Sequence, residues 1–432
     1  MSDAAGHRLT TLPSGVRVVS ESVPGVRSVA LGALIAAGSS TEPARQAGWA
    51  HLLEHMLFRG TARYGSAEID EIFDAMGAEL NAGTDRESTS VYSRVQDRHL
   101  GRAFDVMADM IWRPRIAAED LAAEREIVLE EIAMYEDDPQ EQVFDVLGEA
   151  VFGEHPLGRP VVGSRATVAD AQDEVLRAFH AERYVSGDLV IAAAGSIDHD
   201  ALVGLVAAAE EQGASERAPS PPPAPPADRA PAVRFVAKPT EQYHVTLGAL
   251  GLARGDERRF ALRALDVVLG GTPSSRLFQE IREKRALAYS VSSFHSELAR
   301  TGQVGIYLGT RSENVGSALE ALGEELDRLC EDGVKSAELD RAREHVKGRI
   351  VLGLESTSAR MSRLGATVLA RLPVLSIEEL LERIDAVDGE QVDALARELF
   401  APERMSVAAI GPDEGRFRAS MTGLRGERLE VG

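Results

Sequence analysis

Two histidines and a glutamate lie within five residues, in the pattern His51-x-x-Glu54-His55. The residues around them, 47–58, are otherwise apolar and include no proline and no β-branched side chain, which predicts a buried or cleft-lining helix. Because residues four apart share a helix face, His51 and His55 would present two imidazoles to one point. Such a pair suits tetrahedral zinc, and Glu54 would lie close enough to act on a water molecule there. The alternative to a metal site is that the two histidines form hydrogen bonds with backbone carbonyls.

A later stretch supplies two carboxylates in an apolar setting. Residues 119–136 have apolar side chains at helical spacing, and Glu124 and Glu131 lie seven apart on that same apolar side. A buried glutamate without a partner is costly, which favours a function for both. A catalytic zinc ion needs a third protein ligand and one open position, so we predict one zinc ion per chain, held by His51, His55 and Glu131. Glu124 would hydrogen-bond a ligand imidazole and fix its orientation.

Strands and helices are expected on both sides of these motifs. The expected strands span residues 16–23, 28–37, 80–95, 189–194 and 244–249, and the expected helices span 66–76, 97–112, 119–136 and 198–211, with others starting at 140 and ending near 272. Gly77 and Pro114 follow two of these helices as stop signals.

The chain divides near its middle and repeats itself. Seven prolines between Pro219 and Pro231 predict an extended tether, so we expect a first domain over residues 1–217, a linker over 218–232 and a second domain over 233–432. Residues 121–132 align without a gap with residues 339–350, but Glu124 falls opposite an alanine and Glu131 opposite an arginine. This pattern indicates an old duplication with one active copy.

Composition limits the classes of partner. The formal net charge of −22 argues against nucleic acid and anionic membranes and makes cationic substrates electrostatically plausible. No apolar run has the length of a membrane span or a signal peptide, so we expect a soluble, cytoplasmic protein without a membrane partner. Cys330 is the only cysteine, which rules out an intramolecular disulfide. These features are compatible with a homodimer.

The motifs, taken together, resemble the pitrilysin/insulinase family of zinc peptidases, the inverzincins. The resemblance rests on residues 51–61 and 124–131 and covers nearly the whole chain; within the family it is strongest to the branch of the mitochondrial processing peptidase and its bacterial relatives. It implies an α+β fold of two homologous domains, each a mostly antiparallel sheet flanked by helices, facing each other as a clamshell around a chamber. The implied activity is that of a zinc metalloendopeptidase acting on unfolded peptides or presequence-like segments.

The resemblance also implies residues that contact the substrate. The segment Asn81-Ala82-Gly83-Thr84 resembles the edge strand that pairs with an extended peptide, although alone it could be an ordinary strand and turn. Arg282 and Tyr289, seven apart, match an arginine and a tyrosine that reach the substrate and the tetrahedral intermediate. In this chain Ala286 stands where the family commonly has glycine.

Two further acids match residues that hold an arginine near the cleaved bond in the processing peptidase. They are Glu141 and Asp145, four apart on one helix face; the alternative is a solvated acidic surface. For the whole protein, the alternative to an enzyme is a catalytically silent scaffold or partner subunit of the same fold. The presence of Glu54 favours the enzyme, because silent relatives tend to lose the base or a ligand.

Overall fold

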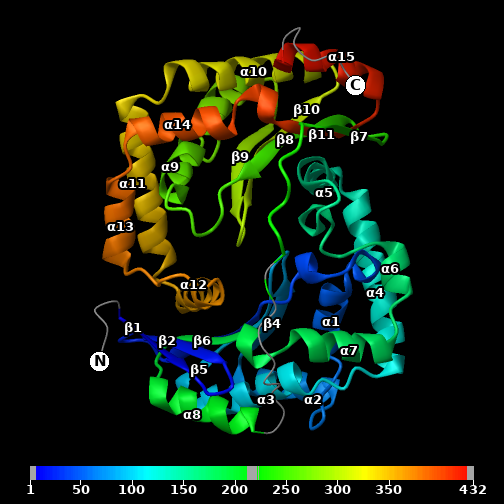
Figure 1. Cartoon of the computed structure of the whole chain (residues 1–432), viewed down its shortest axis with the longest axis vertical. Coiled ribbons are helices and arrows are strands. Elements are labelled where there is room, and N and C mark those ends of the chain that lie inside the picture. The colour runs from blue at the N-terminus through cyan, green and yellow to red at the C-terminus, as the bar shows by residue number, and fades with distance from the viewer. Residues whose placement is uncertain (1–5, 212–220, 222, 426–432) are drawn as a thin grey trace. The chain divides into compact units, whose positions relative to one another are not determined.

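The computed structural model describes residues 6–211, 221 and 223–425 and contains two compact units, each a sheet with helices (Figure 1). The first unit takes its residues from Met1–Ala133, Arg159–Pro223 and Val351–Ile377, and the second from Met134–Gly158, Ala224–Ile350 and Glu378–Gly432. The predicted α+β fold with two sheet-and-helix units is confirmed. Their mutual arrangement as a clamshell stays a prediction.

The sheet of the first unit has six strands in the order β1-β2-β6-β3-β5-β4. The strands are β1 (His7–Thr11), β2 (Arg17–Ser22), β3 (Ser28–Ile35), β4 (Glu79–Thr84), β5 (Thr89–Gln96) and β6 (Leu189–Gly195). All neighbours pair antiparallel except β2 and β6, which are parallel. Its helices are α1 (Trp49–Leu57), α2 (Ser66–Met76), α3 (Leu100–Trp112), α4 (Ala118–Asp137), α6 (Arg165–Ala169), α7 (Asp173–Arg183), α8 (His199–Glu210) and α12 (Thr357–Leu369).

Helices cover both faces of this sheet, which explains why its central strands are apolar throughout. In β6 every residue is buried. Leu189, Ile191 and Ala193 point into a core shared with α1, α3 and α7. The alternate residues of β6 face α12 on the other side of the sheet. Continuous burial of this kind is typical of a strand covered on two faces.

Glycines lie at the contact between helix α12 and the sheet. A Cβ on Gly32 of β3 would lie 2.4 Å from Sδ of Met361, and a Cβ on Gly365 would lie 2.4 Å from Cδ1 of Leu34. Both distances are far below ordinary van der Waals contact, so a side chain at either position would displace Met361 or Leu34. A Cβ on Gly365 would also lie 3.1 Å from Cβ of Ala192, which has no flexible side chain that could move away.

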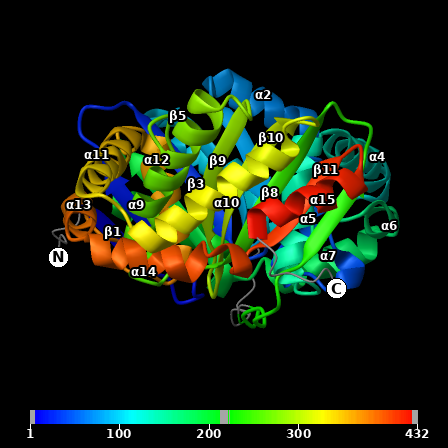
Figure 2. The same ribbon diagram turned by 90° about the horizontal axis from the view of Figure 1, so that it is seen from above.

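The second unit has a five-stranded sheet in the order β7-β11-β8-β10-β9. The strands are β7 (Val233–Ala237), β8 (Gln242–Gly251), β9 (Ser290–Glu297), β10 (Gly302–Arg311) and β11 (Ser406–Gly411). Its helices are α5 (Pro139–Phe152), α9 (Arg259–Leu269), the π-helix η6 (Phe278–Lys284), α10 (Val315–Asp332), α11 (Ser336–Gly353), α13 (Ile377–Asp385), α14 (Gly389–Leu399) and α15 (Glu414–Arg425). Helices α10 and α15 run side by side (Figure 2).

The two sheets have the same connectivity. If β7 to β11 are matched in chain order with β2 to β6, the two strand orders become identical, and the single parallel pair falls at the same place in each sheet. This supports the duplication inferred from the aligned helices, which are α4 and α11.

The units exchange one helix each, so they do not follow the order of the chain. Helix α5, from the first half of the chain, packs on β8 and β11 of the second unit, and α12, from the second half, packs on β2, β3 and β6 of the first. The predicted division at 218–232 stays a prediction. That segment lies partly outside the described residues, and its described residues, 221 and 223–232, contain no helix or strand.

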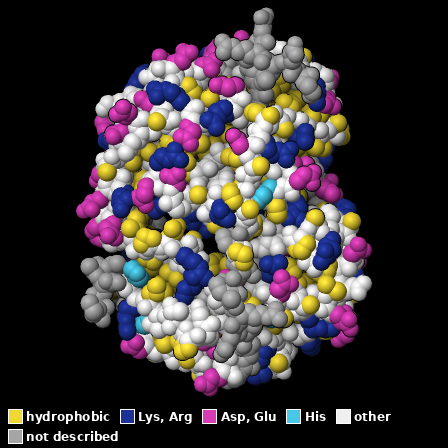
Figure 3. Space-filling model, viewed as in Figure 1, with side chains coloured by type: hydrophobic (Ala, Val, Ile, Leu, Met, Phe, Trp, Pro, Cys, Tyr) yellow, Lys and Arg dark blue, Asp and Glu magenta, His cyan; other side chains and the backbone are white. Residues whose placement is uncertain are grey.

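Helix α13 presents a group of acidic side chains. Figure 3 shows acidic side chains along the edge occupied by α13, which contains Glu378, Glu379, Glu382 and Asp385. Within residues 6–211, 221 and 223–425, no helix combines the length and apolarity needed to cross a membrane.

The close packing of α12 predicts opposite effects for one substitution in two helices. Gly365→Ala should lower the free energy of unfolding by about 1–2 kcal/mol, since overpacking at Leu34 outweighs the gain in helix propensity. Gly348→Ala in α11, where a Cβ meets no atom within 4 Å, should raise it by up to about 1 kcal/mol. Urea unfolding of both variants tests this; equal stabilisation by the two would contradict the close contact.

Candidate metal centre and active site

Helix α1 presents three polar side chains on one side and its apolar residues on the other. Trp49, Ala50, Leu52, Leu53, Met56 and Leu57 are buried in the core of the first unit. His51, Glu54 and His55 are only partly buried, so they line a surface that solvent can reach. The helix is therefore anchored by its apolar face, and the predicted reactive groups lie together on the opposite face.

The N-terminus of α1 is fixed by a buried carboxylate that precedes the helix. Glu42, 3% exposed, accepts hydrogen bonds from the backbone N–H groups of Gly48 (2.9 Å) and Ala50 (2.6 Å). Burial raises the pKa of Glu42 to about 7, while these N–H groups act to lower it. The first turn of a helix leaves such N–H groups unpaired, so Glu42 sets the position of α1 directly before His51.

Glu131 of α4 meets the two imidazoles of α1. Its Oε2 atom lies 3.5 Å from Nε2 of His51 and 3.6 Å from Nε2 of His55, and the rings are 4.7 Å apart at their centroids. In a tetrahedral zinc site with bonds of about 2.0–2.1 Å, ligand atoms lie about 3.3 Å apart. Burial lowers the pKa of His51 to about 4, the neighbouring His55 adding to the shift, so His51 is neutral, as a metal ligand must be. These three residues therefore fit zinc.

Glu124 is almost fully enclosed, with 2% of its surface exposed, and it has two partners. One oxygen lies 2.8 Å from Nδ1 of His55, and the other pairs with the guanidinium of Arg59. A proton held on Nδ1 leaves the lone pair of Nε2 directed toward Glu131. This contact is the one expected of Glu124, and Arg59 supplies the charge that a buried carboxylate requires.

Glu54 is held by a hydroxyl from the edge strand. Oγ1 of Thr84 donates to Oε2 of Glu54 over 2.6 Å, and it lies 3.2 Å from Oγ1 of the buried Thr89. Burial raises the pKa of Glu54, and the hydrogen bond from Thr84 opposes that shift. A carboxylate whose pKa is raised by burial is suited to accept and return a proton.

The predicted substrate strand is β4, an edge strand. Among the described strands it pairs only with β5, with Asn81 opposite Tyr92 and Ala82 opposite Val91. It also packs against α1. The outer edge of such a strand can accept an extended peptide as a further strand. Asn81 and Gly83 are exposed, whereas Ala82 and Thr84 are partly buried.

Arg282 and Tyr289 belong to the second unit and lie together there. The guanidinium of Arg282 lies 4.7 Å from the ring centroids of both Phe278 and Tyr289, which holds it between two aromatic faces. Tyr289 is 78% exposed and available for contacts outside its unit. The structure thus brings this pair together, and its role toward a substrate stays a prediction.

Glu141 and Asp145 lie on α5 in the second unit, on one side of the helix as expected. Glu141 is exposed and Asp145 is partly buried. Their role in binding an arginine of the substrate stays a prediction.

The sequence pattern missed two residues of the site, Arg59 and Glu42, and one contact, that of Thr84. Arg59 lies four residues after His55, a spacing that could have pointed to the same helix face. Thr84 was expected to contact substrate, and its contact with Glu54 was not foreseen. Glu42 had no signal, because it precedes the helix by seven residues and reaches it through an irregular segment.

Two family models match the chain. The model described as insulinase (peptidase family M16) matches residues 17–165, and the model described as the peptidase M16 inactive domain matches residues 170–346. The metal-centre residues all lie in the first match, whereas Arg282 and Tyr289 lie in the second.

Curated relatives match over nearly their whole length. An uncharacterized zinc protease of Streptomyces coelicolor is 43% identical, over 94% of this chain and 89% of its own. Another, from Mycobacterium tuberculosis, is 41% identical, over 95% and 94%. A third, from Bacillus subtilis, is 39% identical, over 93% and 97%.

Solved structures share the fold at lower identity. A protease from Helicobacter pylori superimposes with a TM-score of 0.89 at 21% identity, over 94% of this chain and 99% of that one. A peptidase M16 inactive domain from Pseudomonas fluorescens gives 0.88 at 24% identity, over 94% and 98%. With relatives this similar over this much of the sequence, the chain belongs to the insulinase family of peptidases, M16.

Proposed function

We propose that the protein is a zinc metalloendopeptidase that hydrolyses peptides in an extended conformation. The observation that carries this proposal is the meeting of His51, His55 and Glu131 beside the carboxylate of Glu54. Within the described residues, this is the one group of three or more such side chains with metal-ligand spacing. The names of the relatives as zinc proteases support the same metal.

Each residue of the site has a separate role in the proposed reaction. Zinc, when bound, lowers the pKa of water and polarises the substrate carbonyl. Glu54 takes a proton from the attacking water and passes it to the leaving amine, while Thr84 holds its carboxylate in place. Glu124 keeps a proton on Nδ1 of His55, so that Nε2 is always the atom presented to the metal.

The substrate would lie along the free edge of β4. Its backbone would pair with residues 81–84, which places a peptide bond next to α1, since β4 packs on that helix. Backbone pairing requires an unfolded segment, because a folded protein offers few free strands. Arg282 and Tyr289 would contact the substrate, and Glu141 and Asp145 would favour cationic peptides.

The complete set of groups argues against a silent scaffold. A protein retained only for its fold has no need to keep the neutral His51, the buried Glu124 or the hydroxyl on Glu54, each of which costs burial of a polar group.

One substitution distinguishes the general base from the metal ligands. Glu54→Gln should retain zinc, because Glu54 is not a ligand, and should lower kcat by about 10²–10⁴-fold through loss of general-base catalysis. Metal analysis of the purified variant and turnover of an internally quenched peptide measure both. Full activity in this variant would remove Glu54 from the mechanism.

The second prediction compares neighbouring acids of α4. Glu131→Gln should weaken zinc binding by at least about tenfold, because the amide is a poorer zinc ligand than the carboxylate. Glu130→Gln, an exposed neighbour, should leave it unchanged. Competition with a zinc-chelating dye gives both affinities, and equal affinities in the two variants would exclude Glu131 as a ligand. Chelation should abolish peptide cleavage by the parent, and added zinc should restore it.

The third prediction concerns specificity. Peptides with arginine two residues before the scissile bond should be cleaved about tenfold better than their alanine counterparts, since carboxylates bind guanidinium through charge-assisted hydrogen bonds. Glu141→Gln with Asp145→Asn should remove most of this preference without loss of zinc, whereas Glu154→Gln, an exposed acid of the same unit, should not. No preference in the parent, or the same preference in the double variant, would leave the two acids as surface charge.

A further inference from the structure

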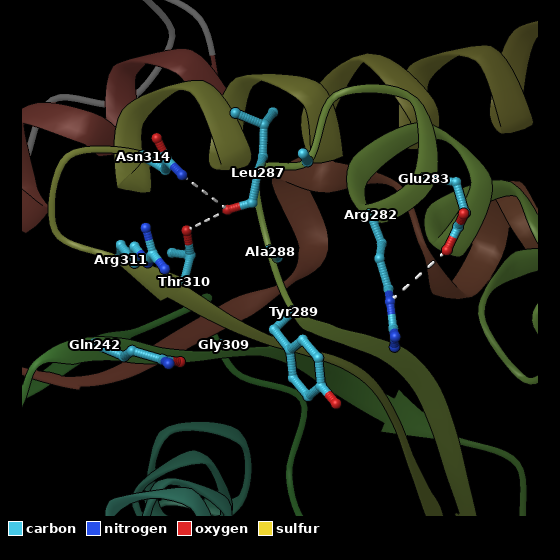
Figure 4. A pocket seen from close by; sticks show the side chains of 11 residues that line it. Gln242, Arg282, Glu283, Leu287, Ala288, Tyr289, Gly309, Thr310, Arg311 and Asn314 are labelled. Carbon is cyan, nitrogen blue, oxygen red and sulfur yellow. Dashed lines mark hydrogen bonds and ion pairs between the residues drawn. The ribbon is translucent and has the colours of Figure 1, made fainter.

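A cavity of about 500 Å³ lies entirely within the second unit. Its walls come from the start of β8, the end of β10 with the segment up to α10, and the loop that joins η6 to β9 (Figure 4). The lining residues are Gln242, Arg282, Glu283, Ala286, Leu287, Ala288, Tyr289, Gly309, Thr310, Arg311 and Asn314. A space of this size accommodates two or three residues of a peptide and is larger than a small inorganic ion needs.

The donors on one wall are unused. Gln242 and Arg311 lie directly opposite each other in the β8–β10 pair, so their side chains are neighbours. Across the described part of the chain, neither the guanidinium of Arg311 nor the side-chain amide of Gln242 has a hydrogen-bond or ion-pair partner. Gly309, between them and the cavity, adds no side chain that would fill the space.

The opposite wall adds a second guanidinium. Figure 4 shows Arg282 and Tyr289 across the cavity from Arg311 and Gln242. Arg282 has only a distant acidic neighbour, with its Nε atom 3.8 Å from Oε1 of Glu283. Two arginines against one glutamate leave the lining with a net charge of +1, on a chain whose net charge is −22.

The loop between η6 and β9 is fixed before any ligand binds. The carbonyl of Leu287 accepts hydrogen bonds from Oγ1 of Thr310 (2.6 Å) and Nδ2 of Asn314 (3.5 Å), and its N–H donates to the carbonyl of Ile281. Ala286 has φ of +52°, in the left-handed region that costs a non-glycine residue energy. A strained backbone held by three hydrogen bonds indicates a preformed cavity, which lowers the entropic cost of binding.

We infer that this cavity binds a carboxylate of the peptide substrate, either an Asp or Glu side chain or the C-terminal carboxylate. Arg311 and Gln242 donate to its oxygens, and Arg282 adds charge from the other wall. The inference rests on the proposed peptidase function and assigns the substrate a second, acidic recognition element. A cationic group here would meet two guanidinium groups, and a purely apolar one would leave the donors of Arg311 and Gln242 unsolvated.

The test uses decapeptides of neutral residues that each carry one Asp, moved along the sequence, and matched peptides with Asn at the same position. A second pair differs only in a free or amidated C-terminus. Binding is measured by fluorescence anisotropy with the full-length, zinc-loaded Glu54→Gln variant, and kcat/KM with the parent. We expect the carboxylate peptide to bind about tenfold better than its amide counterpart for at least one pair, as charge-assisted hydrogen bonds provide.

Arg311→Gln should bring that ratio close to one. The matched control is Arg300→Gln, an exposed arginine just before the other end of β10, about 30 Å away for a ten-residue strand. This control should leave the ratio unchanged. A response in the Asp and Asn set assigns the cavity to a side chain, and a response in the C-terminal pair assigns it to the chain end.

Two results would overturn the inference: no carboxylate preference in any pair, or a preference that survives Arg311→Gln. The proposed function fails separately. If the parent cleaves peptides without a carboxylate preference, the peptidase stands and the cavity assignment falls. If no peptide is cleaved but the Glu54→Gln variant shows the Arg311-dependent ratio, the cavity binds carboxylates in a protein that is not a peptidase.

Discussion

The buried carboxylate of Glu124 joins the two helices on which the metal centre depends. It belongs to α4, whereas its partner His55 lies in α1 and its partner Arg59 lies just after the end of α1. An ionised carboxylate that is 2% exposed is tolerated only when its charge and hydrogen-bonding capacity are satisfied. The relative position of the two helices is therefore set by that contact. Glu131 lies two turns further along α4, so the same contact also brings its carboxylate to the two imidazoles.

The second unit has the same sheet connectivity but lacks the buried carboxylate. At the position aligned with Glu124 it has the fully buried Ala342, and at the position aligned with Glu131 it has the exposed Arg349. The sheet connectivity is nevertheless retained, parallel pair included. The exchange of α5 and α12 adds a further dependence, because each sheet has one apolar face that is covered only by a helix from the other half of the chain. Each half alone would therefore leave one face of its sheet without the helix that covers it.

The elements that the sequence predicted correctly are those that short stretches of the chain determine. The spacing of His51, Glu54 and His55 predicted the helix, and Gly77 predicted the end of α2, where it adopts φ of +61°. The short β1 strand, which is not evident from the pattern, exists only by pairing with β2. The exchange of α5 and α12 could not be predicted either, since an apolar helix face does not specify which sheet covers it. The strain at Ala286 depends on contacts of Leu287 with Thr310 and Asn314, more than twenty residues away in sequence.

Strand β10 of the second unit carries a basic residue at one end and is affected by acidic residues of α5 further along. Tyr307, Gly309 and Arg311 lie at every second position of β10 and therefore on the same face of the strand. Burial raises the pKa of Tyr307 to about 12, and the charges of Asp138 and Glu141 add to the shift, so the acidic end of α5 acts on this strand. Arg311 stands four residues further, about 14 Å along the strand. Tyr307 therefore marks the part of β10 that the acidic groups of α5 affect, and Arg311 marks the part that lines the cavity of the second unit. The contacts proposed for Glu141 and for Arg311 would thus fall at separate places along the strand.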